Sequence, residues 1–269
     1  MLPAGRERRR RDAVGWSRSH AAPRLPHRRR RPVGTGRRWL VDDEPRAAVV
    51  LVHGFTATAD DPSLTTVGQL LHERGLDVVT YDARGHGRSG GESTLGDLER
   101  NDVAAAVELA RTRTDRVVLV GASMGAIAAL GHAATDPALA GVVSVSCPSR
   151  WELPRNPMGV LSALMTRTPP GRAVVARYLR VRVAARWTHP APPVEVVARL
   201  AVPAVFVHGT ADRFIPAAAA DELHRAAGGP SEVILVPGMG HAYEPESTPV
   251  IADAVDDLLA RHVAPATVG

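Results

Sequence analysis

Short runs of apolar, mostly β-branched residues alternate with segments of helical spacing along most of this chain. The apolar runs occupy residues 47–52, 77–81, 117–120, 141–147, 204–207 and 233–236, and the helical segments occupy 63–74, 97–111, 124–134 and 249–262. Continuous apolar strands that alternate with helices are typical of a parallel sheet covered on both faces. We therefore predict an α/β fold with a mostly parallel central sheet and helices on both faces.

One stretch, residues 148–193, breaks this alternation and carries eight prolines. Insertions of this length in a compact domain usually have a function or are disordered. We interpret it as a small lid inserted into a core formed by residues 39–147 and 194–269. Within the lid, residues 171–187 are predicted to form an amphipathic helix. The apolar side chains predicted to pack the lid on the core are Trp151, Leu161, Leu164, Met165 and Trp187.

Charge is distributed unevenly along the 269 residues, in which every basic residue counted as Lys or Arg is Arg. Residues 1–38 hold 13 Arg and two acidic residues, a net charge of +11, whereas residues 39–269 hold 20 Arg and 26 acidic residues, a net charge of −6. We predict that residues 1–38 are a disordered extension, because few apolar residues separate the arginine clusters. The alternative is an arm that binds nucleic acid or a membrane surface.

Two features limit the class of protein. The single cysteine, Cys147, excludes a disulfide framework and a cysteine-based metal site within one chain. No apolar run approaches the roughly 20 residues that span a bilayer, and residues 1–38 lack the apolar stretch of a secretory signal. A cytoplasmic protein is the resulting expectation.

The segment Gly121-Ala122-Ser123-Met124-Gly125 matches the pattern G-x-S-x-G, between a predicted strand and a predicted helix. That setting matters, because the serine must occupy a sharp, strained turn from which its hydroxyl projects. A serine hydroxyl is almost fully protonated at neutral pH and needs a base to become a nucleophile. We therefore take Ser123 as the candidate nucleophile.

His241 is the candidate base among 11 histidines, because it lies in a glycine-rich loop just after the last predicted strand. The carboxyl ends of parallel strands are where functional sites gather. Of the other histidines near strand ends, His53 precedes a Gly-Phe pair that suits an anion-binding loop, and His208 ends the strand before Asp212. Asp212 follows that strand in a tight loop and is the candidate acid that orients the imidazole. Its alternative role is an Asx-turn or a helix N-cap.

The order Ser123, Asp212, His241 along the chain resembles that of the α/β-hydrolase family. His53-Gly54-Phe55 resembles the family's oxyanion loop, and residues 82–89 resemble its glycine-rich turn. The resemblance covers roughly residues 39–263 and implies the α/β-hydrolase fold, with an oxyanion hole formed by the backbone amides of Phe55 and Met124. It implies no metal and no cofactor. Ala122 is a departure, because many lipases of the family carry histidine before the nucleophile.

The predicted lid is strongly basic, since residues 148–190 contain eight Arg and only one acidic residue, Glu152. We expect it either to attract an anionic acyl substrate, a CoA thioester or an acidic lipid surface, or to pair with the acidic core. The expected partner is a small ester or acyl compound, with the membrane surface as an additional partner; nucleic acid is not an expected one. The sequence does not identify substrate-binding residues.

These observations predict a serine hydrolase, of the carboxylesterase kind, that cleaves a carboxylic ester or thioester through an acyl-enzyme. The same three residues also serve aminopeptidases or amidases, carbon–carbon bond hydrolases and perhydrolases. A ligand receptor with this fold but no catalysis is the remaining alternative.

Overall fold

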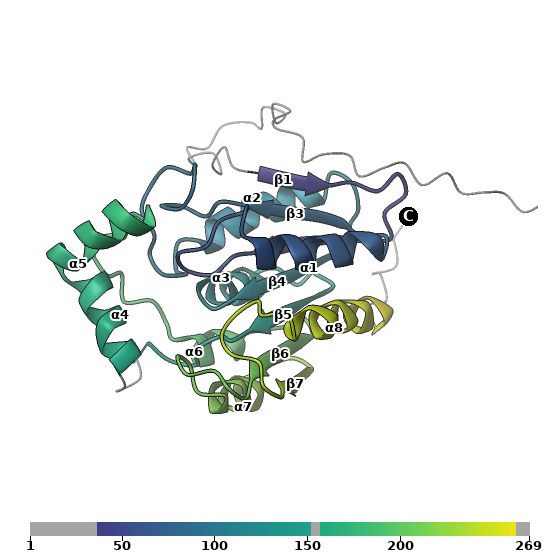
Figure 1. Ribbon diagram of the computed structural model, residues 1–269. Coiled ribbons are helices and arrows are strands. Elements are labelled where there is room, and N and C mark those ends of the chain that lie inside the picture. Colours follow the sequence, from purple (N-terminus) through teal and green to yellow (C-terminus); the bar gives the residue numbers. More distant parts are fainter. Residues whose placement is uncertain (1–36, 152–156, 262–269) are drawn as a thin grey trace, which may run out of the picture.

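The computed structural model describes residues 37–151 and 157–261, and Figure 1 shows one sheet with helices on both sides. The predicted extension lies outside the described residues, apart from Arg37 and Arg38 in the first strand. The strands are β1 (Arg37–Leu40), β2 (Ala48–Val52), β3 (Asp77–Tyr81), β4 (Val117–Ala122), β5 (Gly141–Val145), β6 (Ala204–Gly209) and β7 (Ser231–Val236). The helices are α1 (Pro62–Glu73), α2 (Arg100–Ala110), α3 (Met124–Ala133), α4 (Pro157–Arg167), α5 (Pro169–Val174), the π-helix η1 (Val175–Leu179), α6 (Pro193–Val197), α7 (Ala218–Ala226) and α8 (Ser247–Arg261).

The strands form one sheet in the order β1-β3-β2-β4-β5-β6-β7. Strand β1 pairs antiparallel with β3 at one edge, and all other pairs are parallel. Every residue of β2 to β6 is buried, which explains their continuous apolar sequences. The predicted fold class, a mostly parallel sheet covered on both faces, is confirmed.

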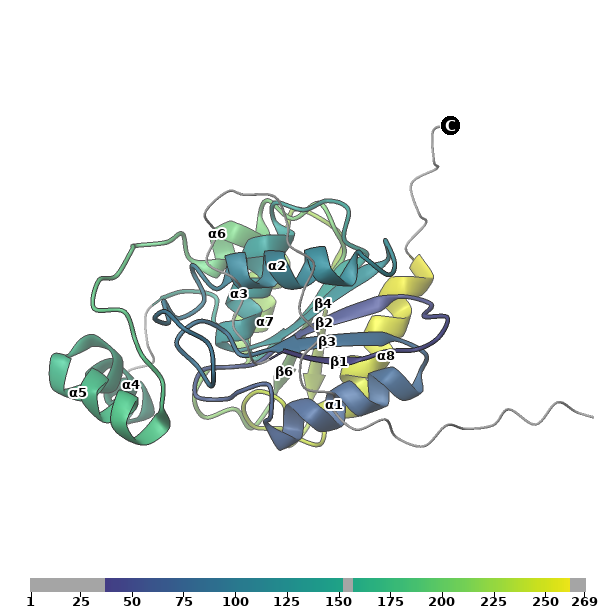
Figure 2. The ribbon, with the colours of Figure 1, turned by 90° about the horizontal axis from the view of Figure 1, so that it is seen from above.

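Two apolar layers hold the helices on the sheet. On one face, α2, α3, α6 and α7 pack on alternate strand residues such as Val50, Leu119 and Phe206. On the other face, α1 and α8 pack on the intervening residues, such as Leu51 and Val120. Figure 2, seen from above, shows α1 and α8 on the opposite side of the sheet from α2 and α3. Helices therefore cover both faces of the sheet. In such folds, functional sites lie in the loops at the carboxyl ends of the strands.

Helices α4 and α5 stand away from the sheet and its covering helices in both ribbon views (Figures 1 and 2). One expectation about this segment is wrong, and a second is wrong in part. The predicted helix over 171–187 ends at Leu179, because Arg180 is left-handed with φ 55° and the chain then becomes extended. In that extended stretch, Val181 and Val183 alternate into a buried cluster with Val175, a spacing of two that a helix does not produce.

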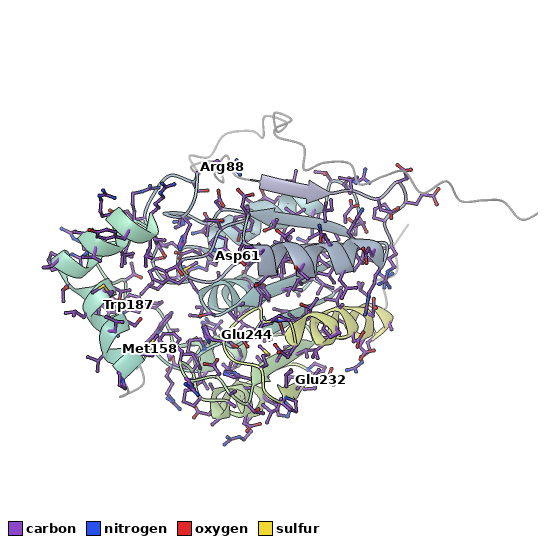
Figure 3. The ribbon with its side chains drawn as sticks, in the orientation of Figure 1. Asp61, Arg88, Met158, Trp187, Glu232 and Glu244 are labelled. Atoms are coloured by element: carbon purple, nitrogen blue, oxygen red, sulfur yellow. The ribbon has the colours of Figure 1, made fainter. Side chains whose placement is uncertain are left out.

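The second expectation, packing of the lid on the core, is wrong for Leu161 and Leu164, whereas Met165 packs with Phe55 on the buried cluster of Val175, Val181 and Val183. Leu161 and Leu164 are 48% and 52% exposed. Gly171 of α5 lies against the α4 backbone at Leu164 and Met165. Trp151 and Trp187 pack edge to face on each other, with ring centroids 4.9 Å apart. In the stick view, Met158 and Trp187 lie at the lid end of the molecule, far from Glu232 of β7 (Figure 3).

The base of the lid is nonetheless joined to the core by backbone hydrogen bonds. The Ser93 amide donates to Arg182 O at 2.7 Å, and the Arg182 amide donates to Gly85 O at 2.9 Å. The Arg182 guanidinium also donates to Gly91 O and Ser89 O. Residues 180–184, which follow η1 and are called the lid stem below, therefore pair with the glycine-rich turn and the loop after it as a short extra strand would.

None of the helices within the described ranges, 37–151 and 157–261, combines the length and apolar character that crossing a bilayer requires.

Candidate active site

Ser123 lies between the end of β4 and the first residue of α3, with φ 53° and ψ −116°. A non-glycine residue in this conformation is strained, and the surrounding backbone holds it there. The Ser123 amide donates to Val145 O of β5 at 2.9 Å. Gly125 allows the turn to lie this close to β2, because a Cβ there would come within 2.5 Å of His53 O. The G-x-S-x-G segment is therefore a strand-turn-helix elbow, as its sequence setting requires.

The structure brings together the three residues that the sequence singled out. Ser123 Oγ and His241 Nε2 are 3.0 Å apart, and His241 Nδ1 and Asp212 Oδ2 are 2.7 Å apart. Because a carboxylate oxygen only accepts hydrogen bonds, Nδ1 carries the proton in this arrangement. Nε2 is then free to accept the hydrogen of the Ser123 hydroxyl. Three loops, after β4, β6 and β7, supply the three side chains.

Asp212 is fully buried as a side chain, yet it stays ionised. Burial on its own raises the pKa of this carboxyl, but the hydrogen bonds from His208 and His241 outweigh burial and hold the pKa well below its usual range. The amides of Phe214 and Ile215 each donate to Oδ1 at 2.8 Å. The carboxylate is therefore fixed in place with Oδ2 facing His241.

The candidate oxyanion donors are the backbone amides of Phe55 and Met124. Met124 is the first residue of α3, where backbone amides have no partner within the helix. Gly54 lies against the elbow, since a Cβ on it would be 3.6 Å from Ser123 Cβ, and Phe55 follows it. The Phe55 ring packs edge-on against His86, with centroids 5.7 Å apart. The loop that carries the Phe55 amide is thus beside the serine.

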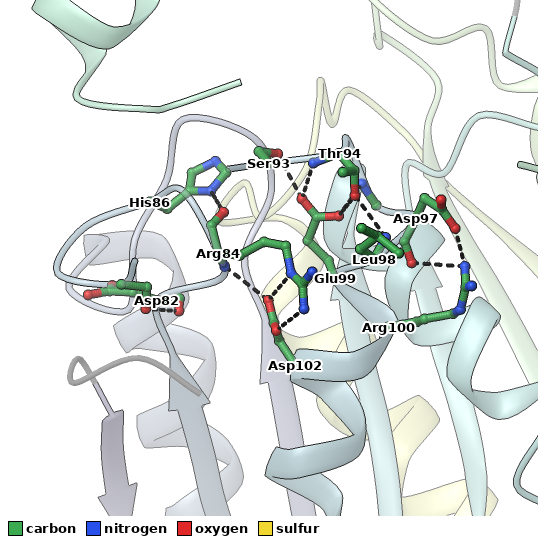
Figure 4. A network of polar contacts seen from close by, with 12 residues as sticks. Asp82, Arg84, His86, Ser93, Thr94, Asp97, Leu98, Glu99, Arg100 and Asp102 are labelled. Carbon is green, nitrogen blue, oxygen red and sulfur yellow. Dashed lines mark hydrogen bonds and ion pairs between the residues drawn. The ribbon is translucent and has the colours of Figure 1, made fainter. Parts of the chain in front are cut away.

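The glycine-rich turn is a support for this edge of the site (Figure 4). Asp82 accepts the amides of Ala59 and Arg88, both at 2.9 Å. The guanidinium of Arg84 forms two hydrogen bonds with Asp102, at 3.0 and 2.7 Å. Both charged side chains therefore bind the turn to neighbouring loops and helices.

Next to that turn, the buried carboxylate of Glu99 closes a tight loop (Figure 4). It accepts the hydroxyls of Ser93 and Thr94 at 2.8 and 2.6 Å, and the amides of Thr94 and Gly96 at 2.8 and 3.0 Å. Ser93 also pairs with the lid stem through Val183. Glu99 therefore fixes the loop on which the lid is anchored.

Sequence reasoning missed three neighbours of the candidate triad. The first is His208, whose Nε2 lies 3.0 Å from Ile215 O and 3.3 Å from Asp212 Oδ2. The second is Phe214, whose ring packs edge-on against His241. The third is Glu244, which accepts the Gly240 amide at 2.6 Å, next to His241. His208 was visible as the residue that ends the strand before Asp212, but nothing in the sequence indicated that its ring turns back to the carboxylate.

The described residues were also compared with the requirements of a cysteine nucleophile and of a metal site. Burial raises the pKa of the Cys147 thiol to about 12, so it is not a nucleophile at neutral pH. Within residues 37–151 and 157–261, no group of three or more His, Cys, Asp or Glu side chains is placed to hold a metal ion.

Comparison with known protein families gives two matches. A family model described as serine aminopeptidase, S33 matches residues 43–191, more than half of the chain, and one described as TAP-like protein matches residues 174–268. The uncharacterized protein YqkD of Bacillus subtilis is 26% identical over 199 residues, which are 72% of this chain and 64% of YqkD. The chain thus spans less than two thirds of the length of this relative.

More distant likenesses extend the comparison. A monoacylglycerol lipase of Mycolicibacterium smegmatis is 44% identical over 54 residues, which are 20% of this chain and 19% of that protein. The structure of an esterase from Pyrococcus furiosus superposes with a TM-score of 0.67 at 20% identity, covering 84% of this chain and 85% of that one. The monoacylglycerol lipase of Paleococcus ferrophilus gives a TM-score of 0.61 at 20% identity, covering 84% and 98% of the two chains. At this identity the two structures show a shared fold.

The family match and the fold together establish that the chain belongs to the α/β-hydrolase superfamily, in the family described as serine aminopeptidase, S33.

Proposed function

We propose that this protein is a serine hydrolase that cleaves a carboxylic ester or thioester through an acyl-enzyme. The observation that carries the proposal is the unbroken line of hydrogen bonds from Ser123 Oγ through His241 to Asp212, at 3.0 and 2.7 Å. This geometry meets the requirement that nucleophile, base and orienting acid lie within hydrogen-bond reach of one another.

In the proposed reaction, His241 Nε2 takes the hydroxyl proton while Ser123 Oγ bonds to the carbonyl carbon of the substrate. The carbonyl oxygen becomes an oxyanion, which the amides of Phe55 and Met124 stabilise. The oxyanion then reforms the carbonyl, and the alcohol or thiol leaves with the proton from His241. A water molecule, deprotonated by His241, then attacks the acyl-enzyme; the bond from Ser123 Oγ to the acyl carbon breaks, Ser123 takes the proton back from His241, and the carboxylic acid is released. Asp212 stabilises the imidazolium in both halves without taking its proton.

Esterase chemistry is preferred over the alternatives because esterases and monoacylglycerol lipases stand among the similar proteins. An aminopeptidase is the second candidate, and the description of the matching family favours it. Carbon–carbon bond hydrolases and perhydrolases have the same requirement for a serine triad. A receptor without catalysis is opposed by the complete hydrogen-bonded line from Ser123 to Asp212.

A substrate panel tests the proposal. We expect turnover of p-nitrophenyl esters or acyl-CoA thioesters, slower or no turnover of aminoacyl anilides, and loss of all turnover in Ser123→Ala. Ser63→Ala, which removes an exposed hydroxyl on α1, is the matched control and keeps wild-type rates. Turnover of anilides alone supports the aminopeptidase. Absence of turnover on every class contradicts the proposed function.

We also propose that the lid attracts anionic acyl substrates to the site. Residues 157–190 contain six Arg and no acidic residue, whereas the chain from 39 onward is acidic overall. Arg167, Arg177, Arg180 and Arg186 are exposed, beside exposed apolar Val160, Tyr178 and Leu179. A basic surface with apolar side chains suits a substrate that has an anionic head and an acyl chain.

A further inference from the structure

We propose that His53 is a positioning residue that sets the direction of the Phe55 amide, one of the two proposed oxyanion donors. The inference rests on the proposed function, because it assigns a role within that reaction. His53 follows β2, and its side chain is completely buried. It contacts neither the hydroxyl of Ser123 nor any other member of the triad by hydrogen bonding, so its role is to act through the backbone.

Two hydrogen bonds define the state of the His53 ring. The Ala83 amide donates to Nε2 at 2.9 Å, and Nδ1 lies 2.7 Å from Gly54 O. Because the amide is a donor, Nε2 must be the unprotonated nitrogen of the ring. Nδ1 therefore carries the hydrogen and donates it to the Gly54 carbonyl.

That carbonyl belongs to the peptide unit whose N–H is the Phe55 amide. The peptide unit is planar, and the described chain contains no cis peptide bond, so its C=O and N–H point in opposite directions. Holding Gly54 O on the His53 ring therefore aims the Phe55 N–H away from it. A hydrogen bond to the carbonyl also polarises the peptide and strengthens its N–H as a donor.

The same loop is pressed against the nucleophile elbow. A Cβ on Gly54 would lie 3.4 Å from Ala122 O, and a Cβ on Gly125 would lie 2.5 Å from His53 O. The Ala57 amide also donates to Gly54 O, at 3.3 Å, so the shorter contact with His53 Nδ1, at 2.7 Å, is one of two hydrogen bonds that orient this peptide. The opposite anchor of the His53 ring is the Ala83 amide, in the glycine-rich turn whose Asp82 and Arg84 are labelled in Figure 4.

The charge state of His53 fits this role. Burial and the neighbouring His86 lower its pKa to about 4, against the opposing effects of the Gly54 hydrogen bond, Asp82 and Asp61. The ring is therefore neutral at physiological pH and keeps Nε2 available for the Ala83 amide. Protonation would place two donors, Nε2–H and the Ala83 N–H, against each other.

Two substitutions of His53 each remove one of the two hydrogen bonds of its ring and keep the other. Asparagine places its amide nitrogen where His Nδ1 lies, so His53→Asn keeps a donor to Gly54 O and loses the acceptor for Ala83. Glutamine places its amide oxygen where His Nε2 lies, so His53→Gln keeps the acceptor and loses the donor. The measurements are kcat and KM on the best ester, the affinity for a trifluoromethyl ketone that forms a tetrahedral adduct, and thermal unfolding.

We expect His53→Gln to lower kcat by about 10- to 100-fold, less than the roughly 100- to 1,000-fold effect of deleting an oxyanion donor. KM changes little, and the affinity for the trifluoromethyl ketone falls in parallel with kcat. His53→Asn stays within about threefold of wild type. Equal losses in both variants, or no loss in His53→Gln, would overturn the positioning role, whereas inactivity of the wild type would instead count against the proposed function.

The tautomer is measurable in the wild-type protein, independently of how the variants fold. Nitrogen NMR of histidine-labelled enzyme at pH 7 should show the His53 ring protonated at Nδ1 and not at Nε2, with His53→Asn identifying the signal. If His53→Asn does not fold, the His53→Gln spectrum makes the same assignment. A ring protonated at Nε2, or at both nitrogens, contradicts the inference.

Discussion

At the scale of single residues, the candidate site depends on a buried carboxylate that is kept charged by its surroundings. Asp212 accepts hydrogen bonds from two backbone amides and from His241, and His208 lies 3.3 Å from the same oxygen that faces His241. Sequence reasoning could name Asp212 and His241 because both follow strands in tight loops. It could not name His208 as a neighbour of the carboxylate, because that contact depends on how the loop after β6 folds back.

Asp212→Asn tests the orienting role. The asparagine amide would face the two histidine donors, so His241 would lose the hydrogen bond that holds its Nδ1–H form. We expect kcat on an ester to fall by about 1,000- to 10,000-fold. The control is Asp221→Asn, which changes an exposed carboxylate on α7. Rates for Asp212→Asn close to those of the control would contradict this role.

A second residue-scale prediction concerns stability and pH. The pKa of His53 lies at about 4 in the folded protein and near 6.5 when unfolded, so the unfolded chain binds the additional proton between these values. The free energy of unfolding should therefore be highest above pH 6.5 and fall as pH drops toward 4, with His53 contributing about 3 kcal/mol of the decrease.

Urea unfolding at pH 7 and pH 4.5 measures this effect. His86 and His132 also have pKa values lowered chiefly by burial, so wild type is compared with His53→Asn, which retains both of them. A smaller loss of stability in the variant supports the account. An identical loss in both proteins would show that His53 is not the group that resists protonation.

At the scale of elements, most of the sheet follows directly from the sequence, because fully buried strands leave continuous apolar runs. The predicted runs at 47–52, 77–81 and 117–120 correspond to β2, β3 and β4. Strand β1 was not predicted, since it is an edge strand of four residues within an arginine-rich sequence. For helix α7 the sequence placed His224 on a helix without giving its bounds, and α6 is a single five-residue segment that begins at a proline.

The lid shows where sequence periodicity is insufficient. Its apolar residues fit a helix over 171–187 only raggedly, and the structure ends that helix at Leu179. The stem beyond it follows the period of a strand because Ser93 and Gly85 provide backbone partners from 89 to 97 residues earlier in the chain. Such partners depend on the tertiary fold and have no signature in the lid sequence.

From the geometry of the elbow, we expect alanine to have different effects on stability and activity at two glycines of α3. Gly125→Ala would place a Cβ 2.5 Å from His53 O and 2.6 Å from Val52 O, both backbone atoms at the carboxyl end of β2. We expect a loss of about 1–3 kcal/mol in the free energy of unfolding, together with loss of the proposed hydrolase activity. Gly131→Ala meets only ordinary contacts with Arg100 at 3.5 Å and should be neutral or stabilising by up to about 1 kcal/mol.

Chemical unfolding of both variants, with activity measured on the same preparations, makes the comparison. If Gly125→Ala retained wild-type stability and activity, the close approach of the elbow to β2 would not be required.

At the scale of the whole molecule, a basic, partly apolar lid projects from an acidic core that carries the candidate site at the carboxyl ends of its strands (Figure 1). Charges on an exposed lid act over about 10 Å at 0.1 M salt. Their influence on catalysis should therefore appear in the rate of substrate capture and be sensitive to ionic strength.

We expect kcat/KM for an anionic ester to fall several-fold when salt is raised, whereas kcat/KM for a neutral ester of equal acyl length changes little. Replacing Arg177 and Arg180 by Ala should reduce the rate for the anionic ester and its dependence on salt. Arg225→Ala, an exposed arginine on α7, is the matched control. Equal salt dependence for both esters would show that the lid does not select charge.

The most direct test of the central claim is covalent labelling of the wild-type protein by a fluorophosphonate, followed by intact and peptide mass spectrometry. We expect one adduct per chain, located on Ser123, absent in Ser123→Ala and formed far more slowly in Asp212→Asn. A wild-type protein that stays unlabelled, or an adduct that persists in Ser123→Ala, would contradict it.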